Sequence, residues 1–99
     1  MSKNKVIKLE DMNKTVIDLK LLGGIWGKQE YYEDTCRELR FNIVIGVSQL
    51  TLFYYPTDDY FEAKTKKQKE ALLKERYNRY CRDYNRLEYA LLTKYRLYE

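Results

Sequence analysis

The sequence predicts an α+β fold, in which a small antiparallel meander of three or four strands precedes one long C-terminal helix. All four glycines and the only proline lie within residues 1–56, where hydrophobic residues alternate with a period of two. After Pro56 the hydrophobic residues follow helical spacing instead. A chain of 99 residues is enough for a single domain, 1–99, with a β-rich part at 1–56 and a helical part at 57–99.

The clearest predicted element is a β-hairpin in the middle of the chain. Hydrophobic side chains alternate with their neighbours from Leu39 to Ile45 and again from Leu50 to Tyr55. The short segment Gly46–Gln49 between the two runs contains a glycine and supplies the turn.

Two further strands are expected before this hairpin. Val6–Leu9 forms the first strand, and the alternation over Ile17–Leu21 forms the second. The paired glycines Gly23 and Gly24 are expected to make a tight turn that leads into Trp26.

A helix is the alternative for residues 10–22, with Gly23 as its terminator. The β-branched run Thr15–Ile17 favours a strand, and the sequence leaves the choice open. The hydrophobic positions that would form one helix face are Leu9, Met12, Val16 and Leu19.

The polar segment Gln29–Arg37 is expected to end a strand and continue as a solvated loop. An acidic patch beside two tyrosines occupies its centre. The patch consists of Glu30, Glu33 and Asp34, next to Tyr31 and Tyr32.

A long helix is predicted after Pro56, with Thr57, Asp58 or Asp59 as its N-cap. A helix from Asp59 to Leu97 would be about 58 Å long, whereas a strand of seven residues spans only ~24 Å. We therefore expect the helix to kink, fold back as a helical hairpin, pair with a second copy, or dock on a partner.

The helix carries a hydrophobic stripe with heptad spacing, which we expect to be core, interface or both. Its tyrosines combine apolar area with a hydroxyl that needs a hydrogen-bond partner, as interface tyrosines do. A homodimer through this helix is one expectation. The stripe consists of Leu73, Tyr77, Tyr80, Tyr84, Leu87, Leu91 and Tyr98.

A basic face is expected on the side of the helix opposite the stripe, because residues 64–86 hold nine basic and three acidic residues. Pairs of Arg79 with Glu75 and with Asp83 would partly neutralise it. Such a face suits a nucleic acid or an acidic protein groove. The candidate contact residues are Lys66, Lys67, Lys69, Arg79, Arg82, Arg86, Tyr89 and Arg96, with Lys64 beside them.

The composition argues against an enzyme. The chain has no histidine, and Cys36 and Cys81 each stand without metal-ligand or catalytic spacing. We expect no catalytic residue, no metal and no cofactor. The N-terminus has no apolar signal region and no run is long enough to span a membrane, so we expect a cytoplasmic protein with reduced thiols.

Amino acids with AT-rich codons dominate: Lys, Tyr, Ile, Asn and Phe total 36 residues, and Ala only 3. This usage is typical of low-GC bacteria and their phages and plasmids. The expected function is a non-catalytic protein-binding module of a phage or mobile element. Such a module would inhibit or modulate a larger host protein, for example a defence nuclease such as a CRISPR effector. The alternative is direct nucleic-acid binding through the basic face of the helix.

Overall fold

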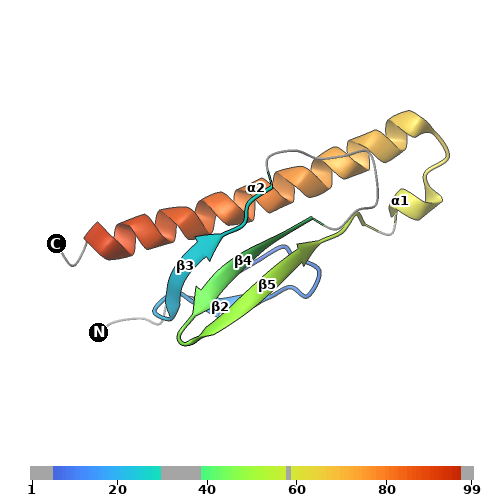
Figure 1. The fold of residues 1–99 in the computed structure, drawn as a ribbon. Helices are drawn as coiled ribbons and strands as arrows, with labels where there is room; N and C mark the ends of the chain where they lie inside the picture. The colour runs from blue at the N-terminus through green and yellow to red at the C-terminus, as the bar shows by residue number, and fades with distance from the viewer. Residues whose placement is uncertain (1–5, 30–38, 58, 97–99) are drawn as a thin grey trace.

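The computed structural model describes residues 6–29, 39–57 and 59–96, and it confirms an α+β fold (Figure 1). Within these residues, five strands precede two helices. The strands are β1 (Val6–Lys8), β2 (Val16–Asp18), β3 (Leu22–Trp26), β4 (Leu39–Ile45) and β5 (Ser48–Tyr54), and the helices are α1 (Asp59–Glu62) and α2 (Lys66–Arg96).

The described strands form two antiparallel sheets instead of one meander. β1 pairs with β2, with Ile7 opposite Ile17. The second sheet has the order β3-β4-β5, and its β4-β5 hairpin pairs Leu39 with Tyr54 and Ile45 with Ser48. The predicted central hairpin is therefore present, although β5 begins two residues earlier than expected.

Residues 10–22 contain the strand β2 between two turns and no helix, so the helical alternative for this segment is wrong. The expected turn position is also wrong, because β2 ends at Asp18 and both Gly23 and Gly24 lie inside β3. Asp18 makes the turn instead: its carboxylate Oδ1 accepts from the Lys20 N–H at 3.0 Å, and its carbonyl accepts from the Leu21 N–H at 3.0 Å. The glycines accompany a register shift between β3 and β4.

The C-terminal part is not one helix from Asp59, because three residues separate α1 from α2. Thr65 and Gln68 form a capping box there: the Gln68 N–H donates to Thr65 Oγ1 at 3.1 Å, and Gln68 Oε1 accepts from the Thr65 N–H at 3.3 Å. α2 then runs unbroken for 31 residues, about 46 Å, so it is not a helical hairpin (Figure 1).

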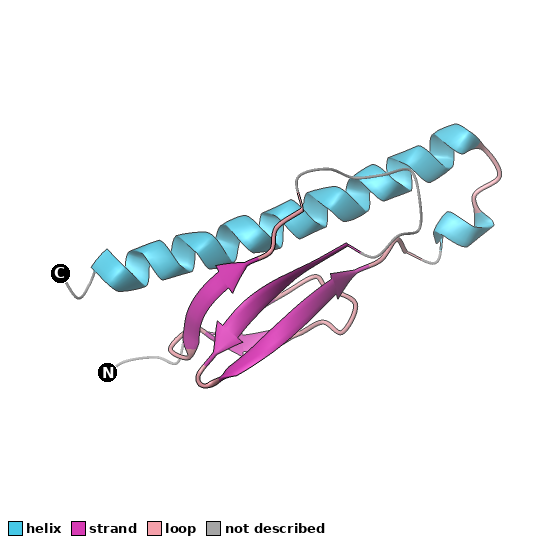
Figure 2. Ribbon diagram, in the orientation of Figure 1, coloured by secondary structure: helices cyan, strands magenta, loops and turns pink. Residues whose placement is uncertain are grey.

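α2 lies along one face of the β3-β4-β5 sheet, and the core fills the space between them (Figure 2). Four rings meet there: Phe41 stacks against Tyr54 at 5.7 Å between ring centroids, and Tyr80 and Tyr84 meet Phe41 edge-on. The β1-β2 hairpin adds buried aliphatic side chains from a second direction. The buried hydrophobic cluster is Ile7, Leu9, Ile17, Leu22, Leu39, Phe41, Ile43, Leu52, Tyr54, Tyr80, Leu87 and Leu91.

Candidate functional site on the C-terminal helix

The heptad stripe of α2 faces the protein's own sheets. Leu73, Tyr80, Leu87 and Leu91 are buried. Tyr77 and Tyr84 are partly buried and pack against the same cluster, and Tyr98 lies outside the described residues. This stripe is therefore committed to the core over the part that the structure describes.

The buried tyrosine hydroxyls find their partners inside the chain. The Tyr80 hydroxyl donates to the Arg40 carbonyl at 2.9 Å and accepts from the Gln29 N–H at 2.7 Å. Burial raises the pKa of Tyr80 to about 12. The Tyr54 hydroxyl donates to Asp83 at 2.6 Å, and burial together with this bond raises the pKa of Tyr54 far above its usual range. Both tyrosines stay neutral at physiological pH.

Asp83 is a buried carboxylate that joins three parts of the fold. Its Oδ2 accepts from the Tyr54 hydroxyl on β5 and from the Glu10 N–H after β1, each at 2.6 Å. Its Oδ1 lies 3.5 Å from Arg86 Nη1. Burial raises the pKa of Asp83, although the bonds from Tyr54 and Glu10 act in the opposite direction.

The sequence contains a signal for this group that our interpretation missed. Asp83 stands three residues after Tyr80 and four before Leu87, which places it beside the buried stripe. A charged residue at such a position must be paired when the stripe is core. The expected Arg79–Asp83 pair is not the one that forms.

Of the three arginines, Arg79 does not face away from the stripe as expected, whereas the side chains of Arg82 and Arg86 are 54% and 44% exposed. Arg79 donates to the Glu10 carbonyl at 3.1 Å and to the Tyr55 carbonyl at 3.0 Å, and its side chain is only 11% exposed. Arg79 directly precedes the buried Tyr80, and a helix turns by only about 100° per residue, so Arg79 falls on the flank of the stripe. The β1-β2 hairpin covers that flank.

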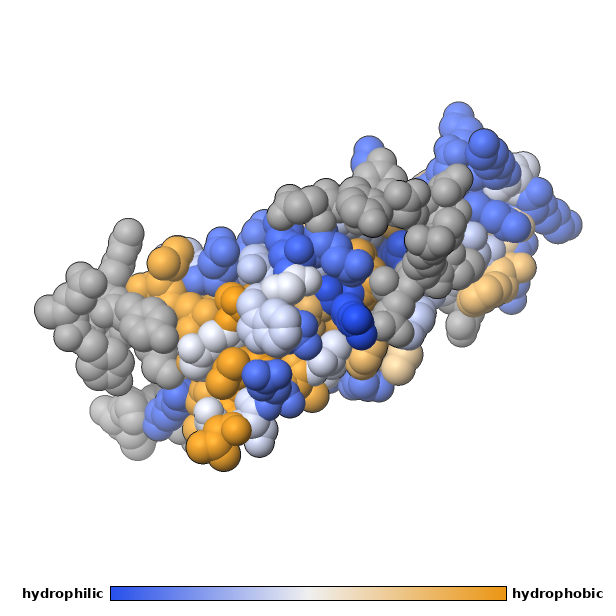
Figure 3. Space-filling view, in the orientation of Figure 1, coloured by the Kyte–Doolittle hydropathy of each residue, from blue (hydrophilic) through white to orange (hydrophobic). Residues whose placement is uncertain are grey.

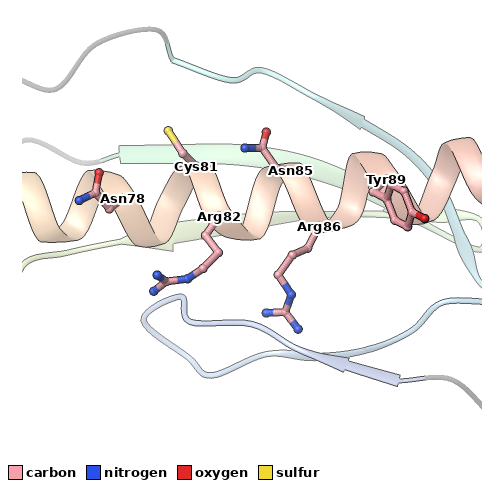
Figure 4. Close-up of a pocket in the computed structure, with 6 residues that line it drawn as sticks. All are labelled: Asn78, Cys81, Arg82, Asn85, Arg86 and Tyr89. Atoms are coloured by element: carbon pink, nitrogen blue, oxygen red, sulfur yellow. The ribbon is translucent and has the colours of Figure 1, made fainter.

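Arg82 and Arg86 reach toward the same hairpin (Figure 4). Arg82 Nη2 forms an ion pair with Glu10 Oε2 at 2.7 Å, and Arg86 Nη1 donates to the Lys8 carbonyl at 3.2 Å. The expected pair of Arg79 with Glu75 is present, with Nε and Oε1 2.8 Å apart. Each of the three arginines therefore contacts β1 or the segment that joins β1 to β2, and these contacts hold the hairpin against α2.

A shallow depression on α2 is lined by six side chains, but these side chains do not converge. Figure 4 shows Arg82 and Arg86 pointing to one side of the helix, while Cys81 and Asn85 point to the other. Cys81 is a free thiol and is partly buried. Because no reactive groups are brought together there, the depression has the character of a contact surface instead of a catalytic pocket.

Part of what α2 leaves in solvent is a long row of side chains, which we call the outer helix face. Glu70, Glu75, Glu88 and Leu92 are exposed on α2 as well but are not counted in it. All side chains of the outer helix face are exposed, and Tyr89 is 72% exposed. It runs for about 33 Å along α2 and holds basic but no acidic side chains. The outer helix face consists of Lys67, Ala71, Lys74, Asn78, Arg82, Asn85 and Tyr89.

The predicted lysines gather where α2 begins. Lys64, Lys66, Lys67 and Lys69 are exposed there, and Lys69 Nζ lies 5.8 Å from the centre of the Tyr60 ring. The surface at the start of α2 is strongly hydrophilic, whereas hydrophobic atoms are exposed near α1 (Figure 3). Arg96 ends α2, and its side chain lies outside the described part of the chain, as do the acidic patch at 30–34, Cys36 and Asp58.

Within residues 6–29, 39–57 and 59–96, no cluster of histidine, cysteine and carboxylate side chains could hold a metal ion. No helix in these segments is long and apolar enough to cross a membrane. Comparison of the chain with protein-family models, with curated proteins and with solved structures finds no match.

Proposed function

We propose that the protein is a non-catalytic binding protein that docks on a larger protein through the outer helix face. In this proposal it belongs to a phage or mobile element and inhibits or modulates a host protein, for example a defence nuclease such as a CRISPR effector. The proposal rests on one observation above all. A surface about 33 Å long carries exposed lysine, asparagine and tyrosine side chains together with Arg82, and none of its seven residues is acidic, while the Glu10 carboxylate pairs with Arg82 at its side.

The geometry favours the outer helix face over the stripe as the docking surface. A homodimer through the stripe would require α2 to leave its own sheet and expose Tyr80 and Leu87, which are fully buried. An acidic surface on a partner would instead meet Lys67 and Lys74 without any rearrangement of the fold. Nucleic-acid contact by α2, the alternative, rests mainly on the lysines at its start, because the arginines are bonded to the β1-β2 hairpin.

The experiment is capture of host proteins from a nuclease-treated lysate by three tagged forms of the protein. The wild type is compared with Lys67→Glu/Lys74→Glu and with a control, Lys14→Glu/Lys20→Glu, which makes the same change of charge near β2. We expect the same host protein to be enriched by the wild type and the control, and lost by the α2 variant. Equal enrichment by all three forms, or enrichment of no protein, would contradict the proposal.

A further inference from the structure

β5 is an edge strand of the sheet β3-β4-β5, and no described strand pairs with its outer edge (Figure 2). The strand at the other edge, β3, is in contact with α2. An edge strand presents a row of backbone N–H and C=O groups that can pair with the backbone of another strand. The outer edge of β5 is therefore the place where this sheet can be extended.

The turn between β4 and β5 determines which backbone groups of β5 point outward. Gly46 has a φ of +59°, and Ile45 and Ser48, on either side of the turn, are register partners. In such a hairpin, residues that bond to the neighbouring strand alternate with residues whose N–H and C=O point away from it. The outward residues of β5 are Gln49, Thr51 and Phe53.

The Phe53 carbonyl confirms this alternation and limits the open part of the edge. It accepts from the Met12 N–H at 2.8 Å, so the segment after β1 occupies that end of the edge. The outward N–H and C=O groups of Gln49 and Thr51 have no hydrogen-bond partner within residues 6–29, 39–57 and 59–96. These two residues form the open part of the edge.

β5 lacks the features by which edge strands commonly avoid pairing, which are charged side chains, prolines and bulges. No residue in 41–57 is charged, the single proline comes after β5, and the register between β4 and β5 runs without a shift. Hydrophobic side chains are also exposed here: Leu50 is 40% exposed and Val47 is 104% exposed. Figure 3 shows hydrophobic atoms on the surface at the turn end of this hairpin.

The open edge is complementary to itself. When two copies meet antiparallel with Leu50 opposite Leu50 of the second copy, Gln49 of each copy lies opposite Thr51 of the other. Because both residues point outward, each such pair exchanges two backbone hydrogen bonds. The two Leu50 side chains then lie in the close, non-hydrogen-bonded position, on the face of the sheet that carries the core.

The same register also covers the exposed hydrophobic side chains, which favours a second copy over a charged ligand. Leu50 is covered by Leu50 of the second copy. Val47 approaches the Phe53 end of the second copy, where Met12 is 56% exposed. The edge offers no charged side chain that would select an acidic or basic ligand.

We propose that the protein forms a homodimer in which the β5 strands of two copies pair antiparallel around Leu50, so that the two sheets become one continuous sheet. Unlike a dimer through the stripe of α2, this dimer leaves Tyr80 and Leu87 in the core. It uses no residue of α2 and does not depend on the function proposed for the outer helix face.

The first test is sedimentation equilibrium at protein concentrations from about 5 to about 500 µM. The wild type should approach twice the 12.1 kDa mass of one chain. Gln49→Pro should weaken dimerisation by about tenfold or more, because proline removes the outward N–H but no bond to β4. The matched control Gln49→Ala keeps this N–H and should dimerise like the wild type, as should Lys67→Glu/Lys74→Glu on α2.

The second test examines whether Leu50 lies opposite itself. Leu50→Lys and Leu50→Glu should each be monomeric when alone, because two like charges would lie directly opposite each other. An equal mixture of the two variants should recover the dimer, because the charges are then opposite in sign. Sedimentation equilibrium of the separate variants and of the mixture measures both effects.

Four results would overturn the proposal. The wild type stays monomeric over the whole range, or folded Gln49→Pro dimerises as strongly as Gln49→Ala. The mixture of the Leu50 variants stays monomeric, or Lys67→Glu/Lys74→Glu abolishes the dimer. Circular dichroism reports the fold of each variant, and the Leu50 pair decides if Gln49→Pro does not fold. If the wild type is monomeric and Gln49→Pro fails to capture a host protein, the edge pairs with that protein and the homodimer is wrong.

Discussion

Asp83 shows at the scale of one residue how the three parts of the fold are joined. Its carboxylate on α2 accepts hydrogen bonds from Tyr54 on β5 and from the backbone after β1. A buried acceptor with charge-assisted bonds contributes strongly only while all of its donors are present. Removal of the carboxylate therefore leaves two donors buried without a partner.

We expect Asp83→Ala to lower the free energy of unfolding by about 3 kcal/mol, because the Tyr54 hydroxyl and the Glu10 N–H lose their common acceptor. Urea denaturation followed by circular dichroism measures the change. Asp83→Asn keeps an oxygen at this position and should cost clearly less. Equal losses for the two variants would show that the hydrogen bonds are not the cause.

The raised pKa of Asp83 also predicts a pH dependence. The ordinary pKa of the group is 3.8, and burial raises it in the folded chain. The folded state therefore holds the proton to higher pH than the unfolded state, so this group makes the free energy of unfolding fall as pH rises between the two pKa values. Denaturation at a series of pH values from 3.5 upward should show this fall in the wild type. Asp83→Asn should lack that contribution, and an identical profile for both proteins would contradict the assignment.

Residue-level prediction from the sequence succeeded where a pattern repeats. The heptad spacing identified Leu73, Tyr80 and Leu87, which are all buried. The sequence also predicted the pair of Arg79 with Glu75. It did not predict the partners of Asp83 or the backbone acceptors of Arg79, which belong to Glu10, Tyr54 and Tyr55, at least 24 residues away. Contacts between residues so far apart in the sequence depend on how the elements pack, and they cannot be predicted from the pattern of a single sequence.

At the scale of elements, the break between α1 and α2 has a local cause. Thr65 and Gln68 exchange hydrogen bonds across the first turn of α2, and no glycine or proline is involved. The sequence motif Thr-x-x-Gln was available to predict the start of α2 at this place. A break of this kind leaves no glycine or proline in the sequence to mark it.

Thr65→Ala should lower the free energy of unfolding by about 1 kcal/mol, because the Gln68 N–H loses its cap. The change is measured by thermal denaturation, with Thr65→Ser as the control that retains a hydroxyl. A loss of the same size in Thr65→Ser would show that the cap is not responsible.

The arginine flank of α2 makes a second element-scale prediction. Arg79→Ala should lower the free energy of unfolding by about 2 kcal/mol, because the carbonyls of Glu10 and Tyr55 lose a charged donor. Lys67→Ala, on the outer helix face, should change stability by no more than about 0.5 kcal/mol. Chemical denaturation of both variants provides the comparison. If both variants change the free energy of unfolding equally little, the Arg79 side chain is exposed, as the sequence predicted, and does not stabilise the fold.

The strands were predicted correctly where local sequence patterns determine them, and incorrectly where packing between distant elements does. The β4-β5 hairpin was recovered almost residue by residue, because alternation and a glycine turn both lie within it. The turn before β3 was misplaced, because Asp18 and not the glycine pair makes it. The division into two sheets was not foreseen, since it depends on how β1-β2 packs beside α2.

At the scale of the whole molecule, α2 is longer than the strands of the sheet on which it lies, and other parts of the chain cover the excess length. The longest strands have seven residues, about 24 Å, and α2 is about 46 Å long. The β1-β2 hairpin covers one flank of α2, and α1 packs beside its first turns (Figure 1). Over the described part of α2 the chain itself therefore covers the stripe, and the docking surface that we propose lies on the outer helix face.

The measurement that tests the central claim most directly is lysine footprinting of the protein with and without its captured partner. An acylating reagent labels exposed lysines, and mass spectrometry reports the extent of labelling at each one. Binding through the outer helix face should protect Lys67 and Lys74, while Lys14 and Lys20 near β2 keep their reactivity. Unchanged labelling of Lys67 and Lys74 in the bound protein would contradict the assignment of this face.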